Sequence, residues 1–365
     1  MSIYFNPVKI VKTDNWFNEL NRYLRNLQIK NPIIITTNGN RERLLLNKKF
    51  SQNLIFSDFG ENPNFNDCNN SIEFCKGFAI DGVITIGGGS AMDLGKVVLA
   101  YLRSGETKIK KLINPGLEYP IDIPSIFLPT THGTASEVTM WGTIWNMEEK
   151  KKYSISHPNL YPKIAILDGA LTLTLPLKIS IITILDALSH SFEAIWNKNS
   201  NEKSTRYAIE AICSILSSID KFKKNQTNIK IRNQLLQAST TAGLAFSNTK
   251  TAAAHSMSYP LTINYNIPHG IASSLTLLPL LEKNGPFIDK ELKIICKKLK
   301  LSINELNTVI SDIPKNIIPF NLKDWGVKKS HIQILVNESF TKGRMDNNIT
   351  ELSNDDVFNI LNTVY

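Results

Sequence analysis

Cysteine is scarce in this sequence and long apolar runs are missing, and each absence excludes a class of protein. The cysteines form no CxxC pair, and their spacing predicts neither a zinc cluster nor a disulfide framework. No apolar run reaches the roughly 18 residues that a membrane span needs, and the opening stretch MSIYFNPVKIVKTDNW has no signal-peptide core. We therefore expect a soluble, cytoplasmic protein with four reduced cysteines, Cys68, Cys75, Cys213 and Cys296.

A clustered basic region is also missing, although 41 lysines and arginines stand against 32 acidic residues, a net charge of +9. The lysines are scattered, often beside asparagine as in NKNSNEKS and KKNQTN, and no basic run contains interleaved aromatic residues. We expect a solvated basic surface rather than a nucleic-acid interface. The positive charge is compatible with a small anionic substrate or cofactor.

The 365 residues suit two domains. Short apolar runs predict strands near residues 32–37, 83–86, 123–131 and 163–167, and helical stretches separate them. This alternation predicts an α/β domain over residues 1–174 with a doubly wound, mostly parallel sheet. Residues 175–365 carry long helix-period stretches and predict a helical second domain. A cleft between the two domains is the expected place for a site.

Two polar stretches follow predicted strands. GGGSAMD, residues 87–93, opens a helix, and its glycines and exposed N–H groups favour an anion such as a pyrophosphate. The spacing is neither GxGxxG nor a P-loop, so a plain strand-to-helix turn without a ligand is the alternative. PTTHGTASEVT, residues 129–139, offers hydroxyl groups that can bind phosphates, and a capped helix start is its alternative.

Two histidine clusters predict a metal site in the helical domain. Asp186 and His190 lie four residues apart in DALSHSFE and so share one helix face. His255 and His269 lie in HSMSYPLTINYNIPHG. Any one of these histidines alone would more often be a hydrogen-bonded core residue than a metal ligand. One carboxylate with three imidazoles suits Fe²⁺ or Zn²⁺. Glu193 lies off the ligand face and is expected to support the ligands or the helix.

Taken together, GGGSAMDLGK, PTTHGTASEVT, DALSHSFE and HSMSYPLTINYNIPHG resemble the iron-containing (group III) alcohol dehydrogenases over essentially the whole chain. The resemblance implies an NAD(P)-binding α/β domain, a helical metal-binding domain, and Asp186, His190, His255 and His269 as the ligands. It also implies a set of cofactor-binding residues, which are Gly87, Gly88, Gly89, Ser90, Asp93, Thr130, Thr131, Thr134 and Lys152.

The sequence departs from this family's pattern at three positions. His132 stands where members often have alanine, and it would lie near the cofactor loop. Tyr259 replaces a second histidine that relays a proton in many members, so Tyr259, water or a ribose hydroxyl is left to donate the proton. Thr37 stands where NAD-preferring members often have an aspartate; Arg41 or Arg43 could lie near a 2′-phosphate, which favours NADP(H) over NAD(H).

A narrower resemblance links this chain to the phosphonoacetaldehyde reductase branch, through GTIWNMEEKKKYSISHPNLYPKIAILD and the stretches around DALSH and TKTAAAHS. That branch reduces the aldehyde to 2-hydroxyethylphosphonate in phosphonate biosynthesis. The sequence offers Lys250, Arg344 and His132 as partners for the phosphonate, and Tyr259 and His132 as catalytic candidates.

Other functions remain open at this point. The first is reduction of a different aldehyde by the same family, as in butanol, lactaldehyde or polyol dehydrogenases. The second is a lyase related to dehydroquinate synthase, which would consume no net NADPH. The third is a non-catalytic metal- or nucleotide-binding protein, although four retained polar ligands argue against it. A homodimer is the expected assembly.

Overall fold

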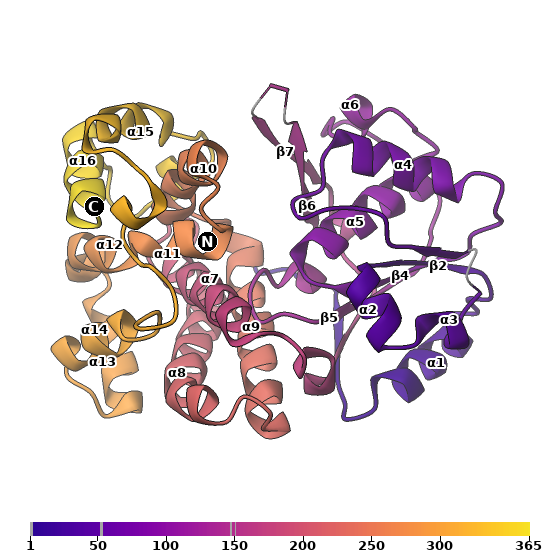
Figure 1. Ribbon diagram of the computed structural model, residues 1–365, viewed down its shortest axis with the longest axis horizontal. Coiled ribbons are helices and arrows are strands. Elements are labelled where there is room, and N and C mark those ends of the chain that lie inside the picture. Colours follow the sequence, from indigo (N-terminus) through magenta and orange to yellow (C-terminus); the bar gives the residue numbers. More distant parts are fainter. Residues whose placement is uncertain (1–2, 52–53, 147, 150) are drawn as a thin grey trace. The chain divides into compact units, whose positions relative to one another are not determined.

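The computed structural model describes residues 3–51, 54–146, 148–149 and 151–365 (Figure 1). The chain forms two compact units. The first contains Asn6–Thr131 and Ala135–Thr172. The second contains Leu173–Tyr365, a short N-terminal segment that ends at Phe5, and the three residues His132–Thr134. The chain therefore passes briefly into the helical unit at His132–Thr134 and stays in it from Leu173 onward.

The first unit is built on one six-stranded sheet. All of its pairings are parallel, and the strand order is β1-β8-β5-β4-β2-β3. The four strands predicted from apolar runs are present, whereas the short β1 and β3 were not predicted. The strands are β1 (Lys9–Lys12), β2 (Pro32–Thr36), β3 (Ile55–Phe56), β4 (Gly82–Gly87), β5 (Ser125–Pro129) and β8 (Ile164–Leu167).

Buried residues alternate between the two faces of this sheet, as the period of a strand requires. Ile33 and Ile35 of β2 join a core with α4 (Phe65–Cys75) and α5 (Gly89–Ser104). Ile34 joins a second core that includes residues of α1 (Trp16–Asn26). Both faces therefore carry apolar packing, and the predicted doubly wound α/β architecture is confirmed.

The order of the strands places a switch point between β2 and β4. From β2 the chain continues to the edge strand β3, whereas from β4 it continues in the other direction to β5 and β8. Open parallel sheets bind ligands at the carboxyl ends of the strands beside such a point. Gly87 is the last residue of β4, and Thr37 directly follows β2. Two of the sequence-predicted cofactor residues, Gly87 and Thr37, therefore lie at this edge of the sheet.

A two-stranded antiparallel hairpin, β6 (Trp141–Asn146) with β7 (Lys151–Ser156), was missed by the sequence patterns. Within β7 only Ile155 is buried, so the sequence of this strand lacks the regular alternation of apolar and polar residues from which strands are predicted. This unit also contains the short helices α2 (Asn38–Arg43), α3 (Leu46–Lys49) and α6 (Ile109–Leu112).

The second unit is helical, and within its described residues no strand follows Leu173. Its three longest helices, α7, α8 and α9, pack against one another. No helix in the described parts of the chain is long and apolar enough to span a membrane. The helices are α7 (Leu177–Ile195), α8 (Glu202–Lys224), α9 (Ile229–Thr249), α10 (Ala253–Tyr265), α11 (His269–Leu275), α12 (Leu277–Asn284), α13 (Asp289–Leu299), α14 (Ile303–Ser311), α15 (Ile332–Glu338) and α16 (Asn354–Thr363).

Candidate metal centre and nucleotide site

Helix α7 supplies the first pair of candidate ligands. Residues Ile184–Ile195 are all buried, so this part of the helix is embedded on every side. Asp186 and His190 lie one turn apart and have 3% and 5% of their surface exposed. Unpaired charge at such depth would be strongly unfavourable. The polar pair therefore requires partners from other helices.

Those partners come from α10 and α11. His255 lies in the first turn of α10, and His269 is the first residue of α11. Gly270 allows α11 to approach α7, because a Cβ at this position would lie 2.2 Å from the Ile182 carbonyl oxygen and 3.1 Å from the Asp186 Cβ. A glycine is thus required where the two helices bring their ligands together.

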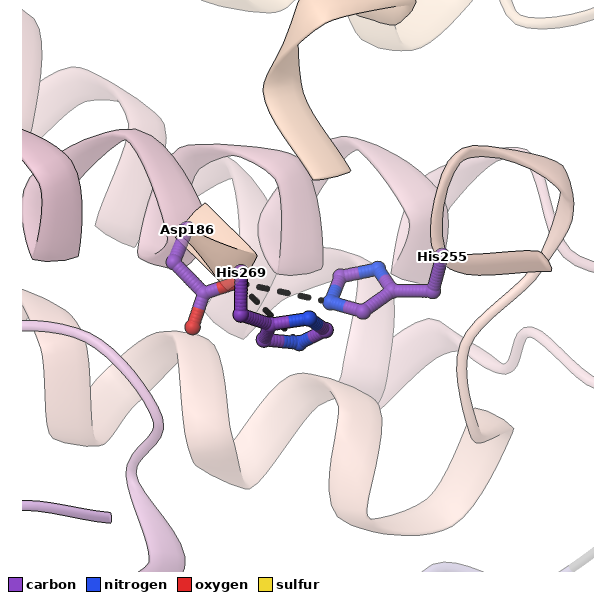
Figure 2. A group of neighbouring side chains, drawn as sticks. All are labelled: Asp186, His255 and His269. Atoms are coloured by element: carbon purple, nitrogen blue, oxygen red, sulfur yellow. Dashed lines mark ion pairs between the residues drawn. The ribbon is translucent and has the colours of Figure 1, made fainter. Parts of the chain in front are cut away.

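Asp186, His255 and His269 form one cluster whose candidate ligand atoms all lie within 4.8 Å of one another. The Asp186 carboxylate is 3.4 Å from His255 Nε2 and 3.9 Å from His269 Nε2. Figure 2 shows the three side chains converging on one point. The His269 side chain is 27% exposed, whereas the other two are buried. The cluster is therefore reached by solvent at His269.

His190, the fourth predicted ligand, lies beside this cluster. Its Nδ1 is 3.8 Å from the Asp186 carboxylate. Its ring stacks on His255 with centroids 4.3 Å apart and on Phe246 with centroids 4.0 Å apart. The structure thus brings three of the predicted ligands into one cluster and holds the fourth in contact with two of them.

Glu193 supports a candidate ligand, which is one of the two roles expected from its sequence. Its carboxylate accepts hydrogen bonds from the backbone N–H groups of Ala252 and His255, at 3.0 and 3.1 Å, and is paired with His255 Nδ1. Histidine ligands of metals usually donate their second ring N–H to such a partner, which fixes the tautomer. Glu193 therefore directs Nε2 of His255 toward Asp186. Its spacing of three from His190 and seven from Asp186 could have indicated this.

The electrostatics of the cluster suit a bound cation. Burial opposes ionisation of Asp186, but His190, His255 and His269 hold the pKa of its carboxyl well below the ordinary value. Burial also opposes protonation of His255, yet Glu193 and Asp186 raise the pKa of His255 to about 10. His255 Nε2 is buried and makes no hydrogen bond among the described residues. A divalent ion would satisfy this nitrogen and balance the carboxylates, so the donor set fits the predicted Fe²⁺ or Zn²⁺.

The glycine turn forms a second candidate site, in the α/β unit. Gly88 is the N-cap of α5, so no side chain caps the first N–H groups of this 16-residue helix. A Cβ at Gly88 would lie 2.9 Å from Thr131 Cγ2, and the Thr130 N–H donates to the Gly87 carbonyl at 3.0 Å. The structure thus joins the glycine turn to Thr130 and Thr131, and a pyrophosphate fits this helix start.

Other predicted cofactor residues surround this turn, with one exception. Ser90 accepts a hydrogen bond from the Asn62 N–H at 3.1 Å. Lys152 lies over the Trp145 ring at 5.6 Å and, with Lys96 and Ser136, opposes the burial that raises the pKa of Asp93 to about 6. Thr134 belongs to the helical unit with His132 and Gly133. The predicted threonine loop is therefore divided between the two units.

His132 does not have the environment expected of a catalytic or phosphonate-binding residue. It is 1% exposed, and burial and Arg232 lower the pKa of His132 to about 3. Neither ring nitrogen makes a hydrogen bond among the described residues, and the ring lies edge-on to Phe222. The imidazole is therefore neutral and embedded. Its ring contacts Phe222 of α8, and its backbone N–H donates to Thr183 of α7. The sequence had suggested a position near the cofactor loop instead.

Tyr259 and Arg344, in contrast, lie together. Tyr259 follows His255 by one turn of α10, and its hydroxyl accepts a hydrogen bond from Arg344 Nε at 3.2 Å. The segment that carries Arg344 is fastened to the same helix, because Ser256 Oγ donates to the Ser339 carbonyl and accepts from the Thr341 N–H. Both side chains are partly exposed. Lys250, the other cationic candidate, is exposed at the end of α9.

Known proteins match the chain along its length. Residues 7–169 match iron-containing alcohol dehydrogenase, and residues 180–365 match the C-terminal part of the Fe-containing alcohol dehydrogenase family. The chain is 30% identical over 241 residues to aldehyde-alcohol dehydrogenase of Streptococcus pneumoniae, which covers 63% of this chain and 27% of that protein. It is 31% identical over 258 residues to probable alcohol dehydrogenase EutG of Escherichia coli, with 69% and 64% covered. The chain thus spans only part of the length of both relatives.

Several solved structures are similar over the whole chain. Sulfoacetaldehyde reductase from Bifidobacterium kashiwanohense, in complex with NAD+, has a TM-score of 0.90 and 27% sequence identity. The match covers 100% of this chain and 98% of that one. The similarity therefore includes the parallel sheet, the helical unit and the segments that carry both candidate sites.

Proposed function

This chain belongs to the iron-containing alcohol dehydrogenase family, and we propose that it reduces a small anionic aldehyde to a primary alcohol. Phosphonoacetaldehyde, reduced to 2-hydroxyethylphosphonate, is the proposed substrate. The observation that carries this proposal is the guanidinium of Arg344, held on Tyr259 one turn beyond His255. A cation thus contacts Tyr259 of α10, the helix that also carries the candidate ligand His255.

The proposed chemistry divides between the two groups that the family binds and the side chains of this chain. A divalent ion held by Asp186, His190, His255 and His269 would supply Lewis acidity at the aldehyde oxygen, and NAD(P)H would supply the hydride. Glu193 orients His255 in this arrangement. Tyr259 is the proposed donor of the proton that completes the alcohol. His269, the exposed ligand, lies where the aldehyde would enter.

Charge and position favour Arg344 among the three candidates for the anionic end. His132 is buried and neutral, and Lys250 is a flexible exposed side chain at a helix end. A guanidinium presents a planar fork of N–H donors that matches phosphonate or sulfonate oxygens. The similar structure is named for sulfoacetaldehyde, a two-carbon aldehyde with an anionic group, which supports the same substrate class. Sulfoacetaldehyde is therefore the second candidate.

We also propose NADP(H) as the preferred cofactor. Thr37, at the end of β2, is the N-cap of α2 and brings no carboxylate to repel a 2′-phosphate. Arg41 lies in the same helix, where its guanidinium contacts Asn47 and Ser57. Arg43 is less suited, because its NH2 group donates to the Leu171 carbonyl at 2.7 Å.

The test is a substrate and cofactor panel on the metal-loaded protein. Oxidation of NADPH and of NADH is followed by absorbance with phosphonoacetaldehyde, sulfoacetaldehyde and butyraldehyde. We expect phosphonoacetaldehyde with NADPH to give the highest kcat/KM. Strong turnover of butyraldehyde with none of either anionic aldehyde would contradict the proposal. Net consumption of NADPH also separates a reductase from a lyase that uses its cofactor transiently.

Arg344→Gln sharpens this test. We expect KM for phosphonoacetaldehyde to rise about 10- to 100-fold, which corresponds to the free energy of a hydrogen bond to a charged group. The kcat/KM for butyraldehyde should change little. Lys342→Gln is the matched control, since Lys342 is exposed on the same segment. Equal effects of the two substitutions would show that general surface charge, rather than Arg344, attracts the substrate.

A further inference from the structure

Lys96 is a fully buried cation on the helix that begins at the glycine turn. It lies in α5, two turns from the start of that helix, with 0% of its surface exposed. Its ammonium donates to Ser136 Oγ at 2.7 Å, to Thr139 Oγ1 at 2.8 Å and to the Trp141 carbonyl at 2.6 Å. All three ammonium protons are therefore used on one short segment, the one that connects the threonine loop to β6.

These bonds fix the direction of a hydroxyl group. Ser136 Oγ accepts from Lys96, so its single proton points to its other partner, Asp93 Oδ1, at 3.3 Å. The backbone of Thr143 makes a second hydrogen bond to the same carboxylate. The result is a directed chain from the ammonium through a hydroxyl to a carboxylate at the nucleotide site. Asp93 is thereby held in one orientation as an acceptor.

Burial of the Lys96 ammonium lowers the stability of the folded protein unless other interactions compensate for it. Burial lowers the pKa of Lys96 to about 7, although Asp93 on the same helix and Glu137 on the facing segment oppose this shift. A fully buried ammonium that is held by neutral oxygens carries a desolvation cost, so stability alone does not favour a lysine at this position. A buried charge with perturbed titration, on the helix that opens at a binding turn, is instead typical of functional sites.

We propose that Lys96 is a positioning residue for the nicotinamide cofactor: its charge holds Asp93 and the segment Ser136–Trp141 in the binding orientation. This inference rests on the cofactor site of the proposed function but does not depend on which aldehyde is reduced. It also makes cofactor affinity sensitive to pH near neutrality. The charged groups that face the ammonium are Asp93 of α5 and Glu137 of the segment that follows β5, and Lys152 of β7 acts on Asp93.

The test measures binding of NADPH without any aldehyde, by nicotinamide fluorescence across a pH series. Wild-type affinity is expected to fall as pH rises through about 7, where the ammonium loses its proton. Lys96→Met, of similar length and no charge, is expected to abolish the step and to raise Kd about tenfold or more just below pH 7, where Asp93, with a pKa of about 6, is still ionised. Lys96→Arg keeps the charge and is expected to bind without a step at neutral pH. Lys110→Met, at an exposed position of the same unit, is the control.

Ser136→Ala provides an independent variant that leaves the ammonium in place and removes its link to Asp93. It is expected to weaken NADPH binding less than Lys96→Met while keeping part of the pH step. Wild-type affinity and an unchanged pH profile in Lys96→Met would overturn the inference, as would a wild-type protein that binds neither NADPH nor NADH. A wild type that shows the pH step but reduces none of the tested aldehydes would refute the proposed substrate class and leave the role of Lys96 intact.

Discussion

The two candidate sites of this protein are built from opposite materials. The metal centre consists of charged and titratable side chains buried among helices, with a carboxylate on either side of His255. The nucleotide site consists of a helix start, glycines and neutral hydroxyl groups. Its charged groups, Asp93 and Lys96, lie further along the same helix. A doubly charged cation needs ligands that carry charge, whereas a pyrophosphate can be bound by backbone N–H groups. We therefore expect substitutions in one site to leave the other intact: changes at the metal centre should lower metal affinity, and changes at the nucleotide site should lower cofactor affinity.

Loss of a metal ligand should have the largest effect. His255→Ala and His269→Ala are each expected to lose the metal and to lower kcat/KM about 1000-fold, equivalent to about 4 kcal/mol of transition-state stabilisation. NADPH binding should remain close to wild type if the sites are independent. Metal content is measured by mass spectrometry, and His331→Ala, a histidine paired with Tyr265 outside the cluster, is the control. Retained metal with near-normal turnover in both variants would refute the ligand assignment.

Removal of the partner of a ligand should have an intermediate effect. Glu193→Gln keeps a hydrogen-bond acceptor for His255 but removes the charge, and it is expected to weaken metal affinity about 10- to 100-fold. Glu193→Ala should weaken it further, because two buried backbone N–H groups then lose their acceptor. Competition with a metal chelator measures both affinities. An unchanged metal affinity in both variants would show that Glu193 serves only the helix.

A change to the nucleotide site should have a smaller effect, and only on the cofactor. Gly88→Ala places a Cβ against Thr131 and is expected to raise Kd for NADPH about tenfold, a typical cost of overpacking. Metal content should not change. Gly39→Ala is the matched control, because a Cβ at Gly39 meets nothing within 4 Å. Loss of metal in Gly88→Ala would show that the two sites are coupled.

Substitution of His132 should have the smallest effect on activity. Its clearest effect should be on the stability of the folded protein in acid. Because the folded state keeps this imidazole neutral down to about pH 3 while the unfolded chain protonates it near 6.5, stability falls as pH decreases between these values. The expected slope is up to about 1.4 kcal/mol per pH unit. His132→Ala should flatten the acid limb of stability by about 2 kcal/mol between pH 6.5 and 5. Urea unfolding of metal-free protein at several pH values measures it; parallel limbs would contradict the prediction.

The sequence predicted best what depends on neighbours along the chain. Apolar runs located the strands around Ile34 and Ile84, and the spacing of four placed Asp186 and His190 on one face. Contacts between distant segments could not be predicted in the same way. The pairing of Glu193 with His255, separated by 62 residues, depends on how α7 and α10 pack. The burial of His132 likewise depends on Phe222 and Arg232, which its local sequence does not reveal.

The segment that carries Arg344 has a consequence for how specificity can change. It is attached to α10 through Ser256 and Tyr259, and none of the four predicted metal ligands lies in it. Replacement of a few residues around Gly343 could therefore exchange the charge offered to the substrate while the metal centre stays intact. Under the proposed function, such an arrangement lets selection alter the preferred aldehyde in small steps while the candidate metal ligands are kept.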